Sequence, residues 1–166
     1  MKEMIKGLDK LEKVVNDFTM KNFGVTAEFG AEFEAMPSIK TIHFNVIVDD
    51  DMQMATIDDM EARFPNIHAD MFFWLLMHEV GHCMTDDIWD EDDEHYFDKM
   101  KEDRLAAYFD GNVFAKNEWY HVIPDEYFAT KWAGLYMSEH PKKMRKFAKK
   151  FHKEFMKFIE KNVTSP

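Results

Sequence analysis

The sequence has little of what a disulfide-stabilised or membrane-spanning protein requires. Cys83 is the single cysteine, so no disulfide can form within the chain, and this fits a reducing compartment. No apolar run approaches the roughly 18 residues of a transmembrane helix, and the first residues lack the charged and apolar regions of a signal peptide. We therefore expect a soluble, cytoplasmic protein without a transmembrane segment.

Glycine and proline are also scarce, at 6 and 5 of 166 residues, and no linker, low-complexity tract or internal repeat is evident. A chain of this length can bury a hydrophobic core without disulfides or structural metals. We expect residues 1–166 to form a single domain.

Negative charge dominates, with a net charge of -11 at pH 7, which argues against nucleic acid as a general partner. From Pro141 to the end, however, nine Lys and Arg face only Glu154 and Glu160, a local net charge of +7. Residues 86–94 hold seven acids and no base. If those acids border a cleft, they would favour a basic peptide.

The hydrophobic pattern changes period along the chain and predicts helices, then strands, then helices again. A helical period covers residues 3–21, and strict alternation over 25–35 and 42–48 predicts two strands in an antiparallel hairpin. The order predicts an α+β, mainly helical fold. The later helices are expected at residues 57–63, from Pro65-Asn66 through the apolar run 71–77, at 98–115, from Pro124, and from Pro141 with a stripe of Phe residues.

One pentapeptide, residues 78–82, has the sequence His-Glu-Val-Gly-His. On a helix, residues four apart lie on the same face, so His78 and His82 can bind one Zn²⁺ ion. Glu79 lies beside the metal rather than on it, where its carboxylate can take a proton from metal-activated water. Gly81 lowers helix propensity, so its position predicts that another backbone comes close. The pattern predicts a zinc-dependent peptidase that acts on a peptide or protein substrate.

A catalytic zinc ion takes three protein ligands, so one more must be found. The metzincin pattern HExxHxxGxxH is excluded, because Thr85 and Ile88 stand where its glycine and third histidine would be. In gluzincins the third ligand is a Glu on a second helix. Glu102 lies 20 residues after His82 and shares the predicted buried face of its helix with Ala106, which would let that helix approach closely.

With the HExxH segment and residues 102–109, the chain resembles the gluzincin-type zinc metallopeptidases, and most closely small prokaryotic and phage forms such as the ImmA/IrrE group. The resemblance implies a minimal zincin domain whose small antiparallel β-hairpin packs against the HExxH helix. It also implies Zn²⁺ on His78, His82 and Glu102, Glu79 as the general base, and a strand beside the cleft that holds an extended peptide.

One departure from the family pattern leaves the third ligand open. Relatives place a small residue and then Asp or Asn three and four residues after the ligand Glu, whereas Leu105 and Ala106 stand there in this chain. Sliding the match to the next pair of residues would make Asp103 the ligand. Asp98 and His95 are further alternatives.

Several other residues have a functional and an ordinary interpretation. Cys83 is expected to be a small core residue, and His43 a surface residue on the polar face of the second strand. A peptidase also needs a donor for the developing oxyanion, although packing or surface positions are the more frequent roles of such residues. The candidate donors are Tyr108, Tyr120, His121 and Tyr127.

Two other functions are compatible with the same residues. The first is a zinc-containing protein-binding module without proteolytic activity, which would keep its metal and its partner after Glu79→Gln. The second is a structural helical domain in which the pentapeptide is coincidental, and which would contain no stoichiometric metal.

Overall fold

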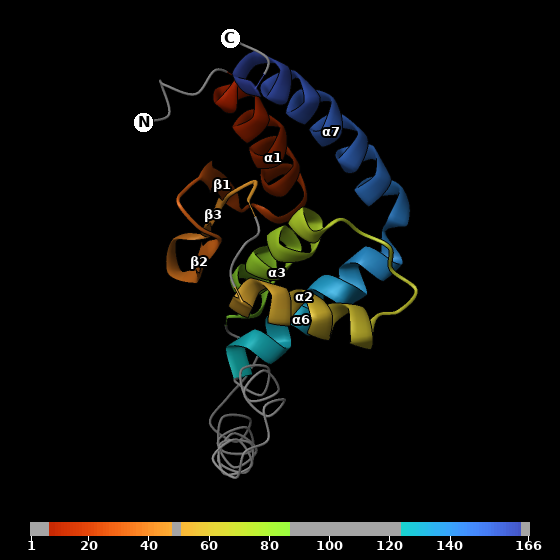
Figure 1. The fold of residues 1–166 in the computed structure, drawn as a ribbon. Coiled ribbons are helices and arrows are strands. Elements are labelled where there is room, and N and C mark those ends of the chain that lie inside the picture. Colours follow the sequence, from red (N-terminus) through yellow and green to blue (C-terminus); the bar gives the residue numbers. More distant parts are fainter. Residues whose placement is uncertain (1–6, 48–50, 87–123, 164–166) are drawn as a thin grey trace.

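The computed structural model describes residues 7–47, 51–86 and 124–163, and Figure 1 shows their arrangement. The predicted α+β, mainly helical fold is confirmed. None of the described helices is long and apolar enough to cross a membrane. The elements are α1 (Leu8–Phe23), β1 (Thr26–Phe29), β2 (Glu34–Met36), the 3₁₀ turn η2 (Pro37–Ile39), β3 (Thr41–Phe44), α2 (Asp51–Arg63), α3 (Met71–Thr85), α6 (Pro124–Glu139) and α7 (Pro141–Val163).

The centre of the fold is α3, which packs most extensively on α6 and also contacts α1, α2 and the sheet (Figure 1). Its run from Phe72 to Met77 is buried on every side, as expected for a central helix, and Trp74 is fully buried. The helix begins at Met71 with Asp70 as its N-cap, not at Pro65-Asn66 as predicted. The Asp70 side chain makes no capping hydrogen bond and pairs instead with His152 (3.0 Å).

The sheet is mixed, in the order β1-β3-β2. β2 and β3 are antiparallel, with Ala35 opposite Ile42, so the predicted hairpin is confirmed for this pair. β1 is parallel to β3, with Ala27 opposite Ile42, so the prediction of one antiparallel strand over residues 25–35 is wrong. The alternation is real, but it continues across a bend that divides the segment into two strands.

That bend is held by Asn45. Its side-chain amide donates hydrogen bonds to the carbonyls of Gly30 (3.2 Å) and Ala31 (2.9 Å). Gly30 also lies against His43, so that an added Cβ would lie 2.9 Å from the His43 Cβ atom. The chain therefore turns back at residues 30–33 and places β2 on the far side of β3.

The two edges of the sheet differ because α1 covers one of them. The Asn16 side chain accepts a hydrogen bond from the Ala27 amide (2.9 Å), and the Glu12 carboxylate accepts one from the Phe29 amide (2.8 Å). These bonds occupy outward-facing donors of β1. At the opposite edge, no backbone hydrogen bond from the described residues covers the outer side of β2.

The sheet is also tied to the end of α3. Lys40, in the left-handed conformation (φ 48°) just before β3, donates a hydrogen bond from Nζ to the carbonyl of Cys83 (2.5 Å). A cation at the last carbonyls of a helix is stabilising. Cys83 is fully buried, as predicted, and burial raises the pKa of its thiol to about 11.

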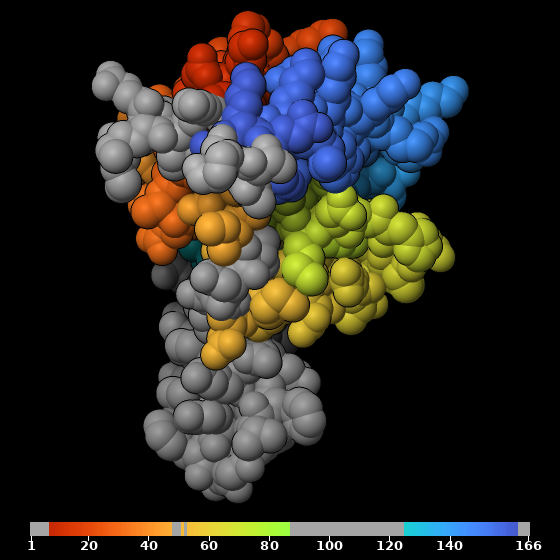
Figure 2. All heavy atoms as spheres, turned by 45° about the horizontal axis from the view of Figure 1, so that its top comes forward, coloured from red at the N-terminus to blue at the C-terminus, as the bar shows by residue number. Residues whose placement is uncertain are grey.

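The last helix, α7, runs antiparallel to α1, because the start of α1 at Gly7 lies beside Phe158 and Lys161 near the end of α7. In Figure 2 the two helices adjoin on one face of the molecule. The predicted stripe of Phe residues on α7 is confirmed, since Phe147 and Phe151 are buried in the core. The helix boundaries at Pro124 and Pro141 are also as predicted.

Candidate metal centre

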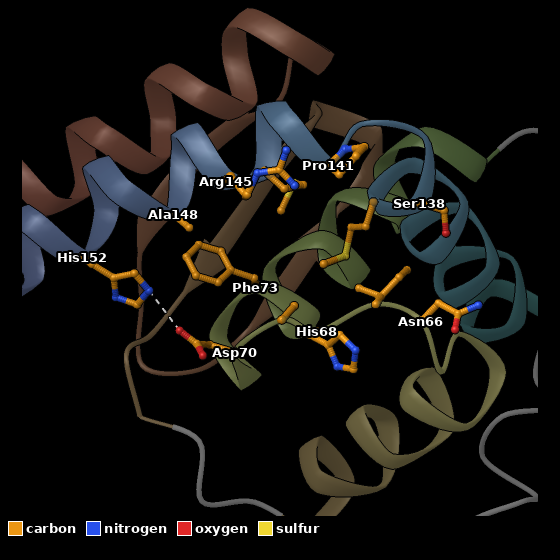
Figure 3. Close-up of a pocket in the computed structure, with 13 residues that line it drawn as sticks. Asn66, His68, Asp70, Phe73, Ser138, Pro141, Arg145, Ala148 and His152 are labelled. Atoms are coloured by element: carbon orange, nitrogen blue, oxygen red, sulfur yellow. Dashed lines mark ion pairs between the residues drawn. The ribbon is translucent and has the colours of Figure 1, made fainter.

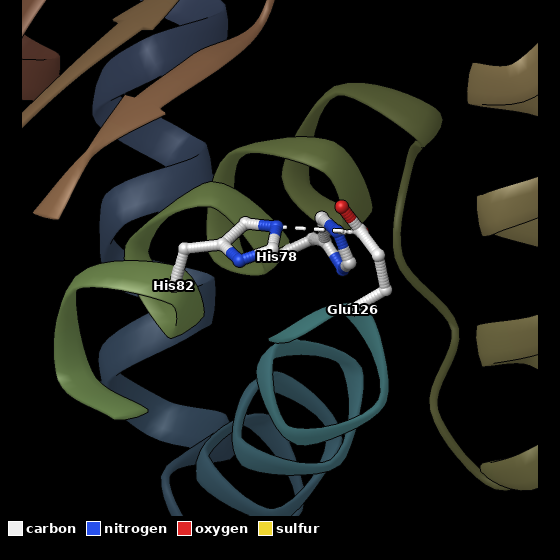
Figure 4. A group of neighbouring side chains, drawn as sticks. All are labelled: His78, His82 and Glu126. Atoms are coloured by element: carbon white, nitrogen blue, oxygen red, sulfur yellow. Dashed lines mark hydrogen bonds and ion pairs between the residues drawn. The ribbon is translucent and has the colours of Figure 1, made fainter. Parts of the chain in front are cut away.

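The two histidines of the HExxH segment and one glutamate converge between α3 and α6. His78 and His82 project from α3, and Glu126 projects from the first turn of α6 toward both rings (Figure 4). One Glu126 carboxylate oxygen lies 2.7 Å from Nε2 of His78 and 3.3 Å from Nε2 of His82. All three side chains are largely buried, with 3%, 12% and 14% of the side-chain surface exposed for His78, His82 and Glu126.

The donor set of this group fits a divalent metal ion. The three ligand atoms lie within 4.8 Å of one another. Around a tetrahedral ion with ligands at 2.0–2.2 Å, donor atoms are roughly 3.3 Å apart, which matches the Glu126–His82 distance, whereas the 2.7 Å contact between Glu126 and His78 would have to open. Two imidazoles and one carboxylate are a donor set found in zinc enzymes. The group can therefore hold a metal ion.

Gly81 determines how closely α6 can approach these histidines. An added Cβ at Gly81 would lie only 2.4 Å from the carbonyl oxygen of Ala129 and 3.0 Å from its Cα atom. The prediction that another backbone comes close to Gly81 is thus confirmed. Because Ala129 is one helical turn after Glu126, this contact brings the Glu126 carboxylate to the level of the histidines.

Thr130 holds the other side of the His78 ring. Its hydroxyl lies 3.1 Å from Nδ1 of His78, and Thr130 is buried. A hydroxyl can donate or accept, so it can pair with either neutral tautomer of the ring. If Nε2 were to bind a metal ion, Nδ1–H would donate to Thr130, which would hold the ring in that orientation.

The charges of the group stabilise one another in the absence of metal. Burial alone would raise the pKa of Glu126, but its hydrogen bonds to His78 and His82 outweigh burial and hold that pKa far below its usual range. For His82, burial opposes the charged form, whereas the hydrogen bond and charge of Glu126 raise its pKa above the usual value. The carboxylate therefore remains charged and ready to bind a cation.

Glu79 lies next to this group without being part of it. Burial raises the pKa of the Glu79 carboxyl. The charges of His78 and His82 lower this pKa, and the charges of Glu126 and Glu34 raise it, so that the net shift is upward. Glu79 directly follows His78 on α3, and the edge strand β2 packs against the same helix. A carboxyl group with a raised pKa at such a position can act as a general base.

No protein-family model, curated protein or solved structure matches the chain.

The structure brings the two predicted histidines together with Glu126, an acid that the sequence interpretation did not consider as the third ligand. Glu102, the predicted third ligand, lies outside the described residues. The alternatives Asp103, Asp98 and His95 also lie outside them. Within the described part of the chain, Glu126 is the acid that reaches both histidines.

A signal for Glu126 is present in the sequence. Ala129 and Thr130 follow it by three and four residues, so a small residue and then a polar one stand where Glu102 has Leu105 and Ala106.

The structure describes two of the other residues that the sequence analysis singled out, Tyr127 and His43. Tyr127 lies on α6 with its ring against Phe128 and 5.5 Å from the guanidinium of Arg63. The remaining proposed oxyanion donors, Tyr108, Tyr120 and His121, lie outside the described residues. His43 lies on the outer face of the sheet, with ring nitrogens 3.7 Å from a carboxylate oxygen of Glu28 and 3.4 Å from one of Glu34.

Proposed function

We propose that this protein is a metal-dependent peptidase in which His78, His82 and Glu126 hold a divalent ion and Glu79 is the general base. One observation carries the proposal: the HExxH helix and a second helix together form a largely buried His-His-Glu group, and Glu79 remains outside it. Zinc is the proposed ion because this donor set is typical of catalytic zinc.

In this proposal each acid has a separate role. A bound divalent ion would polarise the scissile carbonyl and lower the pKa of a coordinated water towards ~7. Glu79 accepts the proton of the attacking water and passes it to the leaving amine. Glu126 keeps its negative charge between the imidazoles, and Thr130 fixes the orientation of the His78 ring.

The open edge of β2 supports binding of an extended peptide. α1 covers β1 through Asn16 and Glu12, which leaves β2 as the edge available for strand addition among the described residues. β2 packs against α3, and the charge of Glu34 on β2 acts on Glu79. A peptide paired with β2 would therefore pass close to the proposed general base.

The charges around the site support a preference for basic peptides. Glu34 on β2 is half exposed, and Asp125 at the start of α6 is exposed and contributes to the raised pKa of His82. Both carboxylates give the surroundings of the metal group a negative potential, which attracts cationic side chains.

The test compares cleavage of a peptide library by wild type and by Glu79→Gln, with the zinc content of both proteins measured by mass spectrometry. Stoichiometric zinc in both and an activity loss of about 10²–10⁴-fold in Glu79→Gln are expected. Glu139→Gln, an exposed position on α6, is the matched control and should cleave like wild type.

Each alternative function gives a different result. Zinc in both proteins with equal cleavage, or with none, would reject the peptidase mechanism, and retained partner capture in Glu79→Gln would then favour a zinc-containing binding module. Absence of stoichiometric metal, with a melting temperature insensitive to chelator, would reject the metal site itself.

A further inference from the structure

A second site lies between α1 and α7. A groove of about 340 Å³ opens where the end of α1 meets the first half of α7, and four lysines line it. Lys21 comes from the last turn of α1, and Lys143, Lys146 and Lys150 come from α7. We call this site the lysine groove.

The four ammonium groups of the lysine groove have no acidic partner among the described residues. The one acid that lines the groove, Asp17, contacts the ammonium of Lys13, at 2.5 Å. Among the described residues, none of the bases between Lys142 and Lys153 forms an ion pair with an acid outside α7, except His152 with Asp70.

Concentrating these lysines is unfavourable for the helix itself. Lys143 and Lys146 are three residues apart and Lys146 and Lys150 four, which are spacings at which like charges repel. The first turn of α7 holds no acid, so Lys142 and Lys143 also add positive charge at the end of the helix where the dipole is already positive. A bound anion would relieve both effects.

The floor of the lysine groove is apolar. The rings of Phe18 and Phe147 stack there with centroids 4.0 Å apart, and Val14 adds to the same surface. A volume of this size is at the lower end of the roughly 300–1,000 Å³ of small-molecule sites. Four ammonium groups at one groove favour a phosphate over a single carboxylate, because a phosphate carries more negative charge and more acceptor oxygens.

Another cavity does not have charges of a single sign. A cavity of about 560 Å³ lies between the segment before α3 and the helices α6 and α7. Figure 3 shows the residues that line it. Its polar groups include Arg145 and the His152–Asp70 ion pair, at 3.0 Å, so positive and negative charges are both present. The lysine groove has one dominant sign and therefore defines a chemical class of ligand.

We propose that the lysine groove binds a small polyphosphate, which contacts Lys21, Lys143, Lys146 and Lys150. This site shares no residue with the candidate metal centre.

The test uses isothermal titration calorimetry at about 0.15 M salt, where long-range attraction is screened. ATP and tripolyphosphate are the probes, and adenosine is the uncharged control. Two variants carry the same change in charge: Lys143→Gln/Lys146→Gln/Lys150→Gln inside the groove, and Lys142→Gln/Lys149→Gln/Lys153→Gln on exposed positions of α7 that do not line it.

We expect at least one polyphosphate to bind and adenosine not to bind. The groove variant should lose about tenfold or more in affinity, and the exposed variant should stay within about twofold of wild type. Tighter binding of ATP than of tripolyphosphate would show that the apolar floor holds an organic group, and the reverse order would show an inorganic ligand.

Three results would overturn the proposal. They are the absence of binding to both polyphosphates, an equal loss in the two variants, and binding only to phosphatidylglycerol vesicles with equal loss in both variants. Melting curves of the variants by circular dichroism confirm folding, since all six substitutions are at exposed positions.

Discussion

The candidate metal centre and the lysine groove contain similar numbers of charged or polar groups, but the chain stabilises them in opposite ways. At the metal centre, Glu126 and the two histidines are largely buried and contact one another, so opposite charges meet within the chain. In the lysine groove, charges of one sign remain in contact with solvent and lack acidic partners among the described residues. The first arrangement is preorganised by folding, and the second leaves its charges to solvent or to a bound anion.

Glu126→Gln should have the largest effect on the difference between the two sites. It removes the anion between His78 and His82, and we expect metal affinity to fall by about 100-fold or more, since even residues behind the ligands contribute 10–100-fold. Titration with zinc against a competing chelator measures the change. Glu102→Gln is the matched comparison, and a large loss in Glu102→Gln with none in Glu126→Gln would return the third-ligand role to Glu102.

Gly81→Ala should disturb the packing that creates the metal centre. The gain in helix propensity of about 1 kcal/mol is outweighed by contact with the Ala129 backbone, so we expect a net destabilisation of about 1–3 kcal/mol. Urea unfolding measures the free energy. Leu135→Ala, at a half-exposed position on α6, should change stability much less, and a stabilised Gly81→Ala would contradict the close approach of α3 and α6.

A pH series tests the buried charges of the metal-free protein. The raised pKa of His82 makes its contribution to stability complete below its usual 6.5 and lost as pH rises through the raised value. The lowered pKa of Glu126 makes its contribution present above 4.5 and lost as pH falls through the lowered value.

Stability from this group should therefore be greatest between pH 4.5 and 6.5, and absent in Glu126→Gln. Zinc competes with the proton on His82, so its affinity should increase roughly tenfold for each pH unit below the pKa of His82. The rise in melting temperature on adding zinc should therefore grow from pH 6 towards pH 8. A rise that is independent of pH would contradict zinc binding to His82.

Thr130→Val is a smaller change at the same site. Without the hydroxyl, the Nδ1 atom of His78 loses its hydrogen-bond partner, and we expect about a tenfold loss of zinc affinity. Thr130→Ser keeps the hydroxyl and should restore most of the affinity. Equal affinities for Val and Ser would show that Thr130 only packs.

The smallest effect is expected on the basic surface of α7. Lys149 lies four residues from Arg145 and Lys153, so Lys149→Gln relieves repulsion and should stabilise the protein by roughly 0.2–0.5 kcal/mol. Urea unfolding at low and high salt measures the gain, which should shrink when salt screens the charges. Destabilisation would show that Lys149 has a favourable partner.

Features of the structure that depend on residues close together in the sequence could be predicted. The spacing of His78 and His82 placed both on one face of α3, and Pro124 and Pro141 marked the starts of two helices. The reversal at residues 30–33 could not be predicted in the same way, because the side-chain alternation continues through it and the Asn45 hydrogen bonds come from a later segment.

Glu126 illustrates a different limit. Which acid on another helix reaches the histidines depends on how the two helices cross, and the length of chain between them does not fix that crossing. The contact of Gly81 with Ala129 decides it here. From the sequence, Gly81 predicted that some backbone would come close, but not which one.

The unequal edges of the sheet also limit how copies of this chain can associate. Asn16 and Glu12 occupy the β1 side, so edge-to-edge pairing through the described strands can use only β2. Two copies joined in this way would cover both of their open edges, and a third copy could not be added. Growth of this sheet would stop at a dimer instead of continuing into a fibre.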